Sequence, residues 1–123
     1  MKILLTGATS GLGRNAADSL LMSGHDVVAI GRNSTQGAAL MQRGARFVPL
    51  DLTCASDKDF FRLVDGCDAV WHCAAKSSPW GSRADFYQNN VLVTQRLAQA
   101  AGRAQIPRFV HISTPAVYFD FRH

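Results

Sequence analysis

The residues best suited to chemistry stand in the first fourteen positions of the chain. Gly7, Gly11 and Gly13 directly follow an apolar run at 2–6. Glycines between a buried strand and a helix permit a tight turn, and they let a diphosphate approach the N–H groups at the helix N-terminus. The spacing here is Gly-x3-Gly-x-Gly, whereas Gly-x-Gly-x2-Gly is the more common pattern. This segment predicts a phosphate cradle, and a tight turn that holds no ligand is the alternative.

Arg32 stands about twenty residues beyond the glycines, at the end of a second apolar run at 26–31. Folds that bind NAD usually have an acidic residue at this position, where it binds the ribose hydroxyls. A carboxylate repels the 2′-phosphate of NADP, whereas a guanidinium forms charge-assisted hydrogen bonds to it. Arg32 therefore favours NADP(H), with Arg14 as a second contact. Asn33 can bind a ribose instead, so NAD is the alternative cofactor.

Further polar residues stand where the third and fourth strands are expected to end. Asp51 can accept a hydrogen bond from the adenine amine, or it can simply begin a turn. His72 and Cys73 are followed by Ala74 and Ala75, whose small side chains would let a cofactor lie close to the backbone. No residue at a suitable spacing completes a metal site with His72, which we interpret as a packed or hydrogen-bonded histidine.

The elements that position these residues alternate between strands and helices. Apolar runs predict strands at 2–6, 26–31, 46–50, 68–75 and 108–113. Apolar spacing and capping signals predict helices at 15–23, 34–42, 56–65 and 82–103. Ser34 is the expected cap of the second helix, and Ser56 begins the third, whose expected apolar side consists of Phe60, Phe61 and Val64. This order predicts the α/β class and a Rossmann-type doubly wound parallel sheet with strand order 3-2-1-4-5, truncated after the fifth strand. Ligands of such sheets bind at the switch point, here between strands 1 and 4.

Composition narrows the class of protein further. The 123 residues, 47% of them hydrophobic and 18% charged, suffice for one folded domain, 1–123. No apolar stretch approaches the roughly 20 residues that span a bilayer, so we expect a soluble, cytoplasmic protein without a membrane partner. A net charge of +4 with scattered arginines does not indicate a nucleic-acid partner. Cys54, Cys67 and Cys73 lack metal-site spacing and predict buried or half-buried free thiols.

Four motifs together resemble the extended short-chain dehydrogenase/reductase family, which includes nucleotide-sugar epimerases and dehydratases and the 3β-hydroxysteroid dehydrogenases. These motifs lie at 6–13, 72–75, 89–91 and 113–118, so the resemblance covers essentially the whole chain. The glycine spacing is that of the compact short-chain enzymes, TGxxxGxG, rather than the TGxxGxxG usual in extended members. Residues 76–81 are similar to the branch that acts on hydroxysteroids and related 3-oxo or 3-hydroxy lipids.

The resemblance implies hydride transfer between a nicotinamide cofactor, NADP(H) or NAD(H), and a carbonyl or alcohol substrate. It implies cofactor contacts from Gly7, Thr9, Ser10, Gly11, Leu12, Gly13, Arg14, Arg32, Asn33, Asp51, Leu52, Ala74, Ala75, Lys76 and Asn90. Of these, Asn90 resembles a structural asparagine of the family. Thr114 falls on the catalytic Ser/Thr, whose hydroxyl would bond the substrate carbonyl or alkoxide; an ST-turn is the structural alternative.

The family's catalytic tyrosine, with a lysine four residues after it, has no match in this chain. Tyr87 is followed at that spacing by Val91, and Tyr118 is followed by Arg122. Loss of a general acid/base typically costs about 10²- to 10⁴-fold in rate. We therefore expect the chain to be the N-terminal portion of a longer enzyme and to be inactive alone.

Two alternatives to the reductase remain open at this point. The intact protein can be a nucleotide-sugar epimerase or dehydratase with bound NAD, since these enzymes share the same first half. It can also be a non-catalytic module that senses the dinucleotide. A homodimer through the exposed fifth strand is a further expectation, because a sheet edge is prone to pair with another edge.

Overall fold

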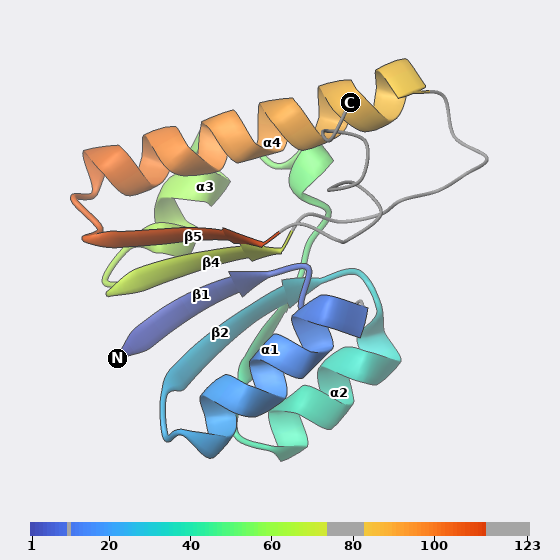
Figure 1. The fold of residues 1–123 in the computed structure, drawn as a ribbon, viewed down its shortest axis with the longest axis vertical. Coiled ribbons are helices and arrows are strands. Elements are labelled where there is room, and N and C mark those ends of the chain that lie inside the picture. The colour runs from blue at the N-terminus through green and yellow to red at the C-terminus, as the bar shows by residue number, and fades with distance from the viewer. Residues whose placement is uncertain (10, 74–82, 113–123) are drawn as a thin grey trace, which may run out of the picture.

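A parallel five-stranded sheet forms the centre of the computed structural model (Figure 1). The structure describes residues 1–9, 11–73 and 83–112, with side chains from residue 91 onward in the last range. The strands are β1 (Lys2–Thr6), β2 (Asp26–Gly31), β3 (Arg46–Pro49), β4 (Ala69–Cys73) and β5 (Arg108–Ile112). Their spatial order is β3-β2-β1-β4-β5 and every pair is parallel, which confirms the predicted topology.

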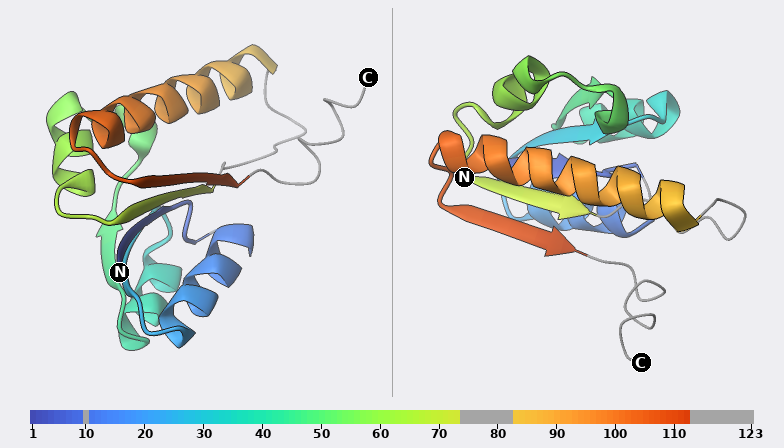
Figure 2. Two further views of the ribbon diagram at one scale, coloured as in Figure 1. Left: turned by 60° about the vertical axis from the view of Figure 1, so that its left-hand side comes forward. Right: turned by 90° about the horizontal axis from the view of Figure 1, so that it is seen from above.

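Helices cover both faces of the sheet. The helices α1 (Gly11–Met22) and α2 (Ser34–Gln42) lie on one face, while α3 (Asp57–Val64) and α4 (Arg83–Arg103) lie on the other (Figures 1 and 2). A short 3₁₀ turn, η1 (Leu52–Cys54), follows β3. Within the described part of the chain, none of the helices has both the length and the apolar character needed to cross a membrane.

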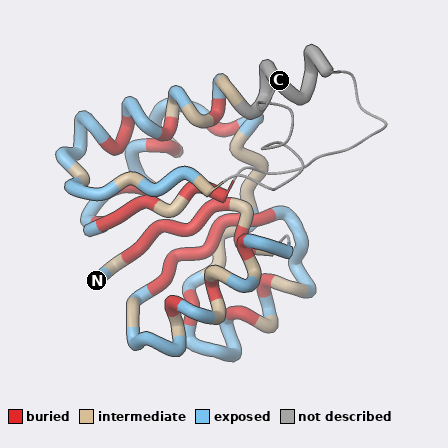
Figure 3. Tube along the Cα trace, viewed as in Figure 1, coloured by how far each residue is buried: buried red, intermediate tan, exposed pale blue. Residues whose placement is uncertain are grey.

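Alternation along the strands divides the core into two layers. Ile3 and Leu5 of β1 point toward α1 and α2, and Leu4 between them packs with residues of α3 and α4. The central strands are buried along nearly their whole length, as the red segments of Figure 3 show. Burial on both faces explains why these strands read as continuous apolar runs in the sequence.

The sequence predicted the N-cap of α3 correctly but not that of α2. Ser56 caps α3 as expected: its hydroxyl accepts the Asp59 N–H at 3.2 Å, and the Asp59 carboxylate accepts the Ser56 N–H at 3.0 Å. The expected cap of α2, Ser34, is wrong. Asn33 caps that helix, because its side-chain oxygen accepts the Gln36 N–H at 3.1 Å.

Tertiary contacts also account for three other differences. The helix α1 begins at Gly11 rather than at 15, although glycine disfavours helices, because its first turn rests on the preceding backbone. Phe61 is 39% exposed and was wrongly assigned to the core; Phe60 and Val64, four residues apart, occupy that face. All three thiols are free, but Cys54 is exposed in η1 rather than buried.

Candidate functional site

The turn between β1 and α1 requires glycine at two positions. Gly7 has a φ of +65°, and a Cβ there would lie 2.8 Å from the Cys73 carbonyl oxygen at the end of β4. A Cβ on Gly13 would overlap the carbonyl group of Gly7 itself. The first turn of α1 therefore lies directly against the strand ends, and both glycines are needed for this close backbone approach.

Gly11 differs from the other two glycines because it faces open space. It is exposed, and a Cβ added there would meet no atom of the described residues within 4 Å. Gly11 is also the first residue of α1, where backbone N–H groups have no partner within the helix and the helix dipole favours an anion. This combination of open space and oriented N–H groups fits the diphosphate of a dinucleotide.

The carboxyl ends of the first three strands are held together beside this turn. The Ala8 N–H donates to the Ile30 carbonyl at 3.0 Å, and the Leu50 N–H donates to the Gly31 carbonyl at 3.1 Å. The side chain of Thr9 lies so close to Gly31 that a Cβ there would come within 2.7 Å of it. The residues that follow β2 and β3 consequently lie next to the predicted cradle.

Arg32 and Asp51 come together at these strand ends. Nη1 of Arg32 lies 3.7 Å from Oδ2 of Asp51, and their side chains are 56% and 38% exposed. An exposed pair of this kind contributes about 0–1 kcal/mol. The other oxygen of Asp51 accepts from the N–H and the hydroxyl of Thr53, at 3.0 and 2.7 Å. Asp51 is therefore fixed by η1, whereas the Arg32 guanidinium can move to a phosphate at low cost.

Arg14 and Asn33, also predicted cofactor contacts, have structural roles in the described residues. Arg14 donates to Asp18 at 3.5 Å and to the Gln36 side chain, so it joins α1 to α2. The Asn33 side chain caps α2. Both lie on the α1–α2 side of the strand ends, and their contact with a cofactor stays a prediction.

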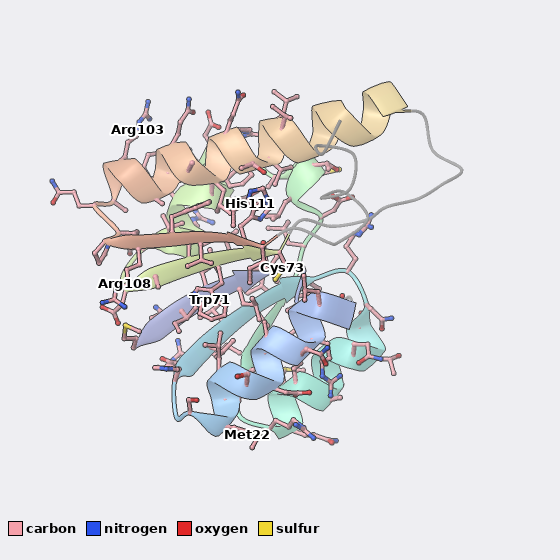
Figure 4. All side chains as sticks on the ribbon, viewed as in Figure 1. Met22, Trp71, Cys73, Arg103, Arg108 and His111 are labelled. Atoms are coloured by element: carbon pink, nitrogen blue, oxygen red, sulfur yellow. The ribbon has the colours of Figure 1, made fainter. Side chains whose placement is uncertain are left out.

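His72 forms a buried hydrogen-bond network beside the turn. Its Nδ1 lies 2.6 Å from the Thr6 hydroxyl, and its Nε2 lies 2.9 Å from the Thr94 hydroxyl of α4. The ring stacks on His111 of β5 at 5.1 Å, on the side of the sheet that faces α4 (Figure 4). The interpretation of His72 as a packed, hydrogen-bonded histidine is confirmed. Sequence reasoning missed both threonine partners, and no local pattern marks Thr94.

Burial, and to a lesser extent the neighbouring His111, lowers the pKa of His72 from the ordinary 6.5 to about 4. The imidazole is therefore neutral at pH 7, with one nitrogen donating and the other accepting. A neutral ring joins β1, β4 and α4 without placing a charge beside the cradle.

Several predicted site residues lie outside the described part of the chain. They are Ser10, Ala74, Ala75, Lys76 and Thr114, and the side chain of Asn90 is outside it as well. Leu12 is 38% exposed on the first turn of α1, and Leu52 begins η1 beside Asp51. The structure thus brings together the predicted residues of β1, α1, β2 and β3 at one edge of the sheet.

We expect His72 to make stability depend on pH. Its folded-state pKa of about 4 lies below the ordinary 6.5, so the unfolded chain takes up the proton first as the pH falls. Between pH 7 and pH 5 this group should lower the free energy of unfolding by about 2 kcal/mol. In urea unfolding of His72→Asn, the loss of unfolding free energy between pH 7 and pH 5 should be smaller than in the parent protein by that amount. Equal slopes in His72→Asn and the parent would contradict the assignment.

Comparison with known proteins places this site in a family. The model of the NAD dependent epimerase/dehydratase family matches residues 3–123. YbjS of Escherichia coli (strain K12) is 46% identical and the 2-alkyl-3-oxoalkanoate reductase of Stenotrophomonas maltophilia (strain K279a) is 36% identical, each over all of this chain. The chain spans only 36% of the length of either relative.

A solved structure supports the same placement. A short-chain dehydrogenase/reductase superfamily protein of Agrobacterium tumefaciens, crystallised with bound NAD, superposes with a TM-score of 0.77 at 28% identity. The match covers 99% of this chain and 35% of that one. The resemblance inferred from the four motifs is therefore confirmed, and the chain belongs to the NAD dependent epimerase/dehydratase family.

Proposed function

We propose that residues 1–123 form the cofactor-binding domain of a longer, NADP(H)-preferring reductase of this family. The observation that carries the proposal is the glycine turn, in which Gly7 and Gly13 bring α1 against the strand ends while Gly11 opens toward solvent. The N–H groups at the start of α1 would bind the diphosphate. A relative with bound NAD and the same fold supports this assignment.

The adenosine end of the cofactor would lie over β2 and β3. There Arg32 would bind the 2′-phosphate of NADP(H), and Asp51 would accept a hydrogen bond from the adenine amine. Their proximity, 3.7 Å between charged atoms, supports a shared role at one end of the ligand. The nicotinamide would then lie toward the ends of β4 and β5, near Ala74 and Ala75.

The substrate we propose is a 3-oxo lipid or a related 3-hydroxysteroid-like compound. When bound, NADP(H) supplies the hydride that reduces such a carbonyl. The Thr114 hydroxyl would donate a hydrogen bond to the substrate oxygen and stabilise the negative charge that develops there. The reductase of Stenotrophomonas maltophilia named for 2-alkyl-3-oxoalkanoates, 36% identical, supports this class of substrate. The remaining part of the protein would provide the tyrosine and lysine.

A nucleotide-sugar epimerase or dehydratase with bound NAD is the second candidate. The Asp51 carboxylate favours it, because it partly neutralises Arg32 and thereby weakens attraction for a 2′-phosphate. The family name covers both activities. Cofactor preference and substrate turnover separate the two candidates.

Gly11→Val should block the cradle without unfolding the domain. The new side chain would enter the open space at the start of α1, where the diphosphate is expected, and would weaken binding of both NADP(H) and NAD(H) by at least about tenfold. Gly102→Val is the matched control, since Gly102 is also exposed, helical and without a described neighbour within 4 Å. Calorimetric titration of the full-length proteins measures the effect. Unchanged affinity in Gly11→Val would place the dinucleotide elsewhere.

Arg32→Gln should affect one cofactor more than the other. Loss of a charge-assisted hydrogen bond to the 2′-phosphate should raise the Kd for NADPH about 10- to 100-fold and leave that for NADH nearly unchanged. Arg108→Gln provides the control, because Arg108 is an exposed arginine on β5, at the far edge of the sheet. Fluorescence titration with both reduced cofactors gives the ratio. Equal effects on NADPH and NADH would favour the NAD-binding candidate.

The full-length protein should oxidise NADPH in the presence of a 2-alkyl-3-oxoalkanoate and leave UDP-sugars unchanged. Thr114→Ala should lower kcat by about 10²- to 10³-fold, because the hydrogen bond to the developing oxyanion is lost. Thr114→Ser should retain most of the rate, since it keeps the hydroxyl. Absorbance at the nicotinamide band and sugar analysis measure the two reactions. Turnover of a UDP-sugar with no reduction of the 3-oxo acid would overturn the reductase proposal.

A further inference from the structure

A second pocket lies on the α3 face of the sheet, away from the cradle. It has a volume of about 430 Å³ and opens between α3 and the strands β2 and β3. Pockets that bind small molecules usually measure roughly 300–1,000 Å³. The size therefore suits a small organic ligand.

The floor of this pocket is apolar. Val28 of β2, which is 9% exposed, belongs to the core layer under α3 and α4. Val48 of β3 and Leu63 of α3 line the pocket and pack against the same layer. A short hydrocarbon chain placed on these three side chains would be removed from water.

Three cations line the same pocket. Lys2 is the first residue of β1, Arg46 is the first residue of β3, and Arg62 lies in the last turn of α3. A crossover helix runs back along the sheet, so all three stand at the amino edge of the strands. No ion pair within 4 Å joins any of them to another described residue.

Four other arginines of the described chain form ion pairs, whereas Arg103 and Arg108 form none with a described residue. Arg14, Arg32, Arg43 and Arg96 each pair with an aspartate at 2.8–3.7 Å. Lys2, Arg46 and Arg62 thus form no such pair with a described aspartate, even though Asp26 pairs in register with Lys2. Asp26 is exposed and does not line the pocket.

Among the described residues that line the pocket, one is acidic. The carboxylate of Asp59 accepts the Ser56 N–H in the capping box of α3, and this bond, chiefly, holds its pKa below the usual range. The charged Asp59 carboxylate therefore already accepts a hydrogen bond from the backbone of α3. With three cations and this one carboxylate among its described lining residues, the pocket has a net positive charge next to its apolar floor.

We propose that this pocket binds a small amphipathic anion, an alkyl or acyl chain of medium length with a phosphate or carboxylate head. The chain would lie on Val28, Val48 and Leu63. The head would sit between Arg46 and Arg62, whose planar guanidinium groups match the geometry of phosphate and carboxylate oxygens. The head would sit at the amino edge of the strands, opposite the edge that the proposed cofactor site uses, although the pocket also reaches Leu50, which directly precedes Asp51.

Octyl phosphate is a suitable probe for the full-length protein. In NMR spectra with labelled Val and Leu methyl groups, it should shift the Val28, Val48 and Leu63 signals in a saturable way. Inorganic phosphate has the head alone and octyl glucoside has a neutral head, so both should bind at least about tenfold more weakly. Octanoate in place of octyl phosphate distinguishes the two head groups. Saturation with NADPH should leave the affinity for octyl phosphate unchanged.

The double variant Arg46→Ala/Arg62→Ala tests the charge requirement. Both side chains are exposed, so the fold should persist, as the Tm will show, while the Kd for octyl phosphate rises at least about tenfold. Arg108→Ala, an exposed arginine on the far edge strand, should leave the Kd unchanged. Equal binding of octyl glucoside, an unchanged Kd in the double variant, or displacement by NADPH would each overturn the proposal.

Discussion

The close approach of two backbone segments at the start of the chain determines the geometry of the site. A side chain on Gly13 would overlap the carbonyl of Gly7, and a side chain on Gly7 would collide with the backbone of Cys73. Because neither has a Cβ, α1 begins directly over the ends of β1 and β4. The positive end of its dipole then lies at the topological switch point between β1 and β4, where ligands of such sheets bind. Without that approach, the N–H groups of α1 would not face the site.

Charge is distributed unequally between the two edges of the sheet. At the carboxyl edge the helix terminus and Arg32 are positive, Asp51 balances Arg32, and His72 adds no charge because burial keeps its ring neutral. At the amino edge Arg46 and Arg62 form no ion pair with a described residue, although the Asp59 carboxylate lies close enough to Arg62 for their charges to interact. The two proposed ligands differ accordingly: a dinucleotide whose phosphates would meet backbone N–H groups, and a smaller anion that side chains would hold.

The order of elements was predictable from the sequence because the central strands β1, β2 and β4 are buried on both faces and are therefore largely apolar in sequence. Contacts between residues that are far apart in the sequence were not predictable. Arg14 meets Gln36, and Thr6 and Thr94 meet His72, across 22 to 66 residues. Nothing in a local pattern indicates such partners. The same limit explains why α1 was expected to begin after its glycines, since helix propensity alone disfavours them.

Arg32 can pair either with Asp51 or with the 2′-phosphate of a bound cofactor, and the free energies of these two interactions affect the choice of cofactor. If the guanidinium leaves Asp51 for a 2′-phosphate, the protein loses an exposed pair worth about 0–1 kcal/mol and gains charge-assisted bonds worth roughly 1.5–3 kcal/mol. Asp51 is not left unsatisfied, because Thr53 still donates two hydrogen bonds to it, at 3.0 and 2.7 Å. In the proposed binding mode the exchange would therefore favour the phosphorylated cofactor, and the carboxylate beside Arg32 would reduce that preference without reversing it.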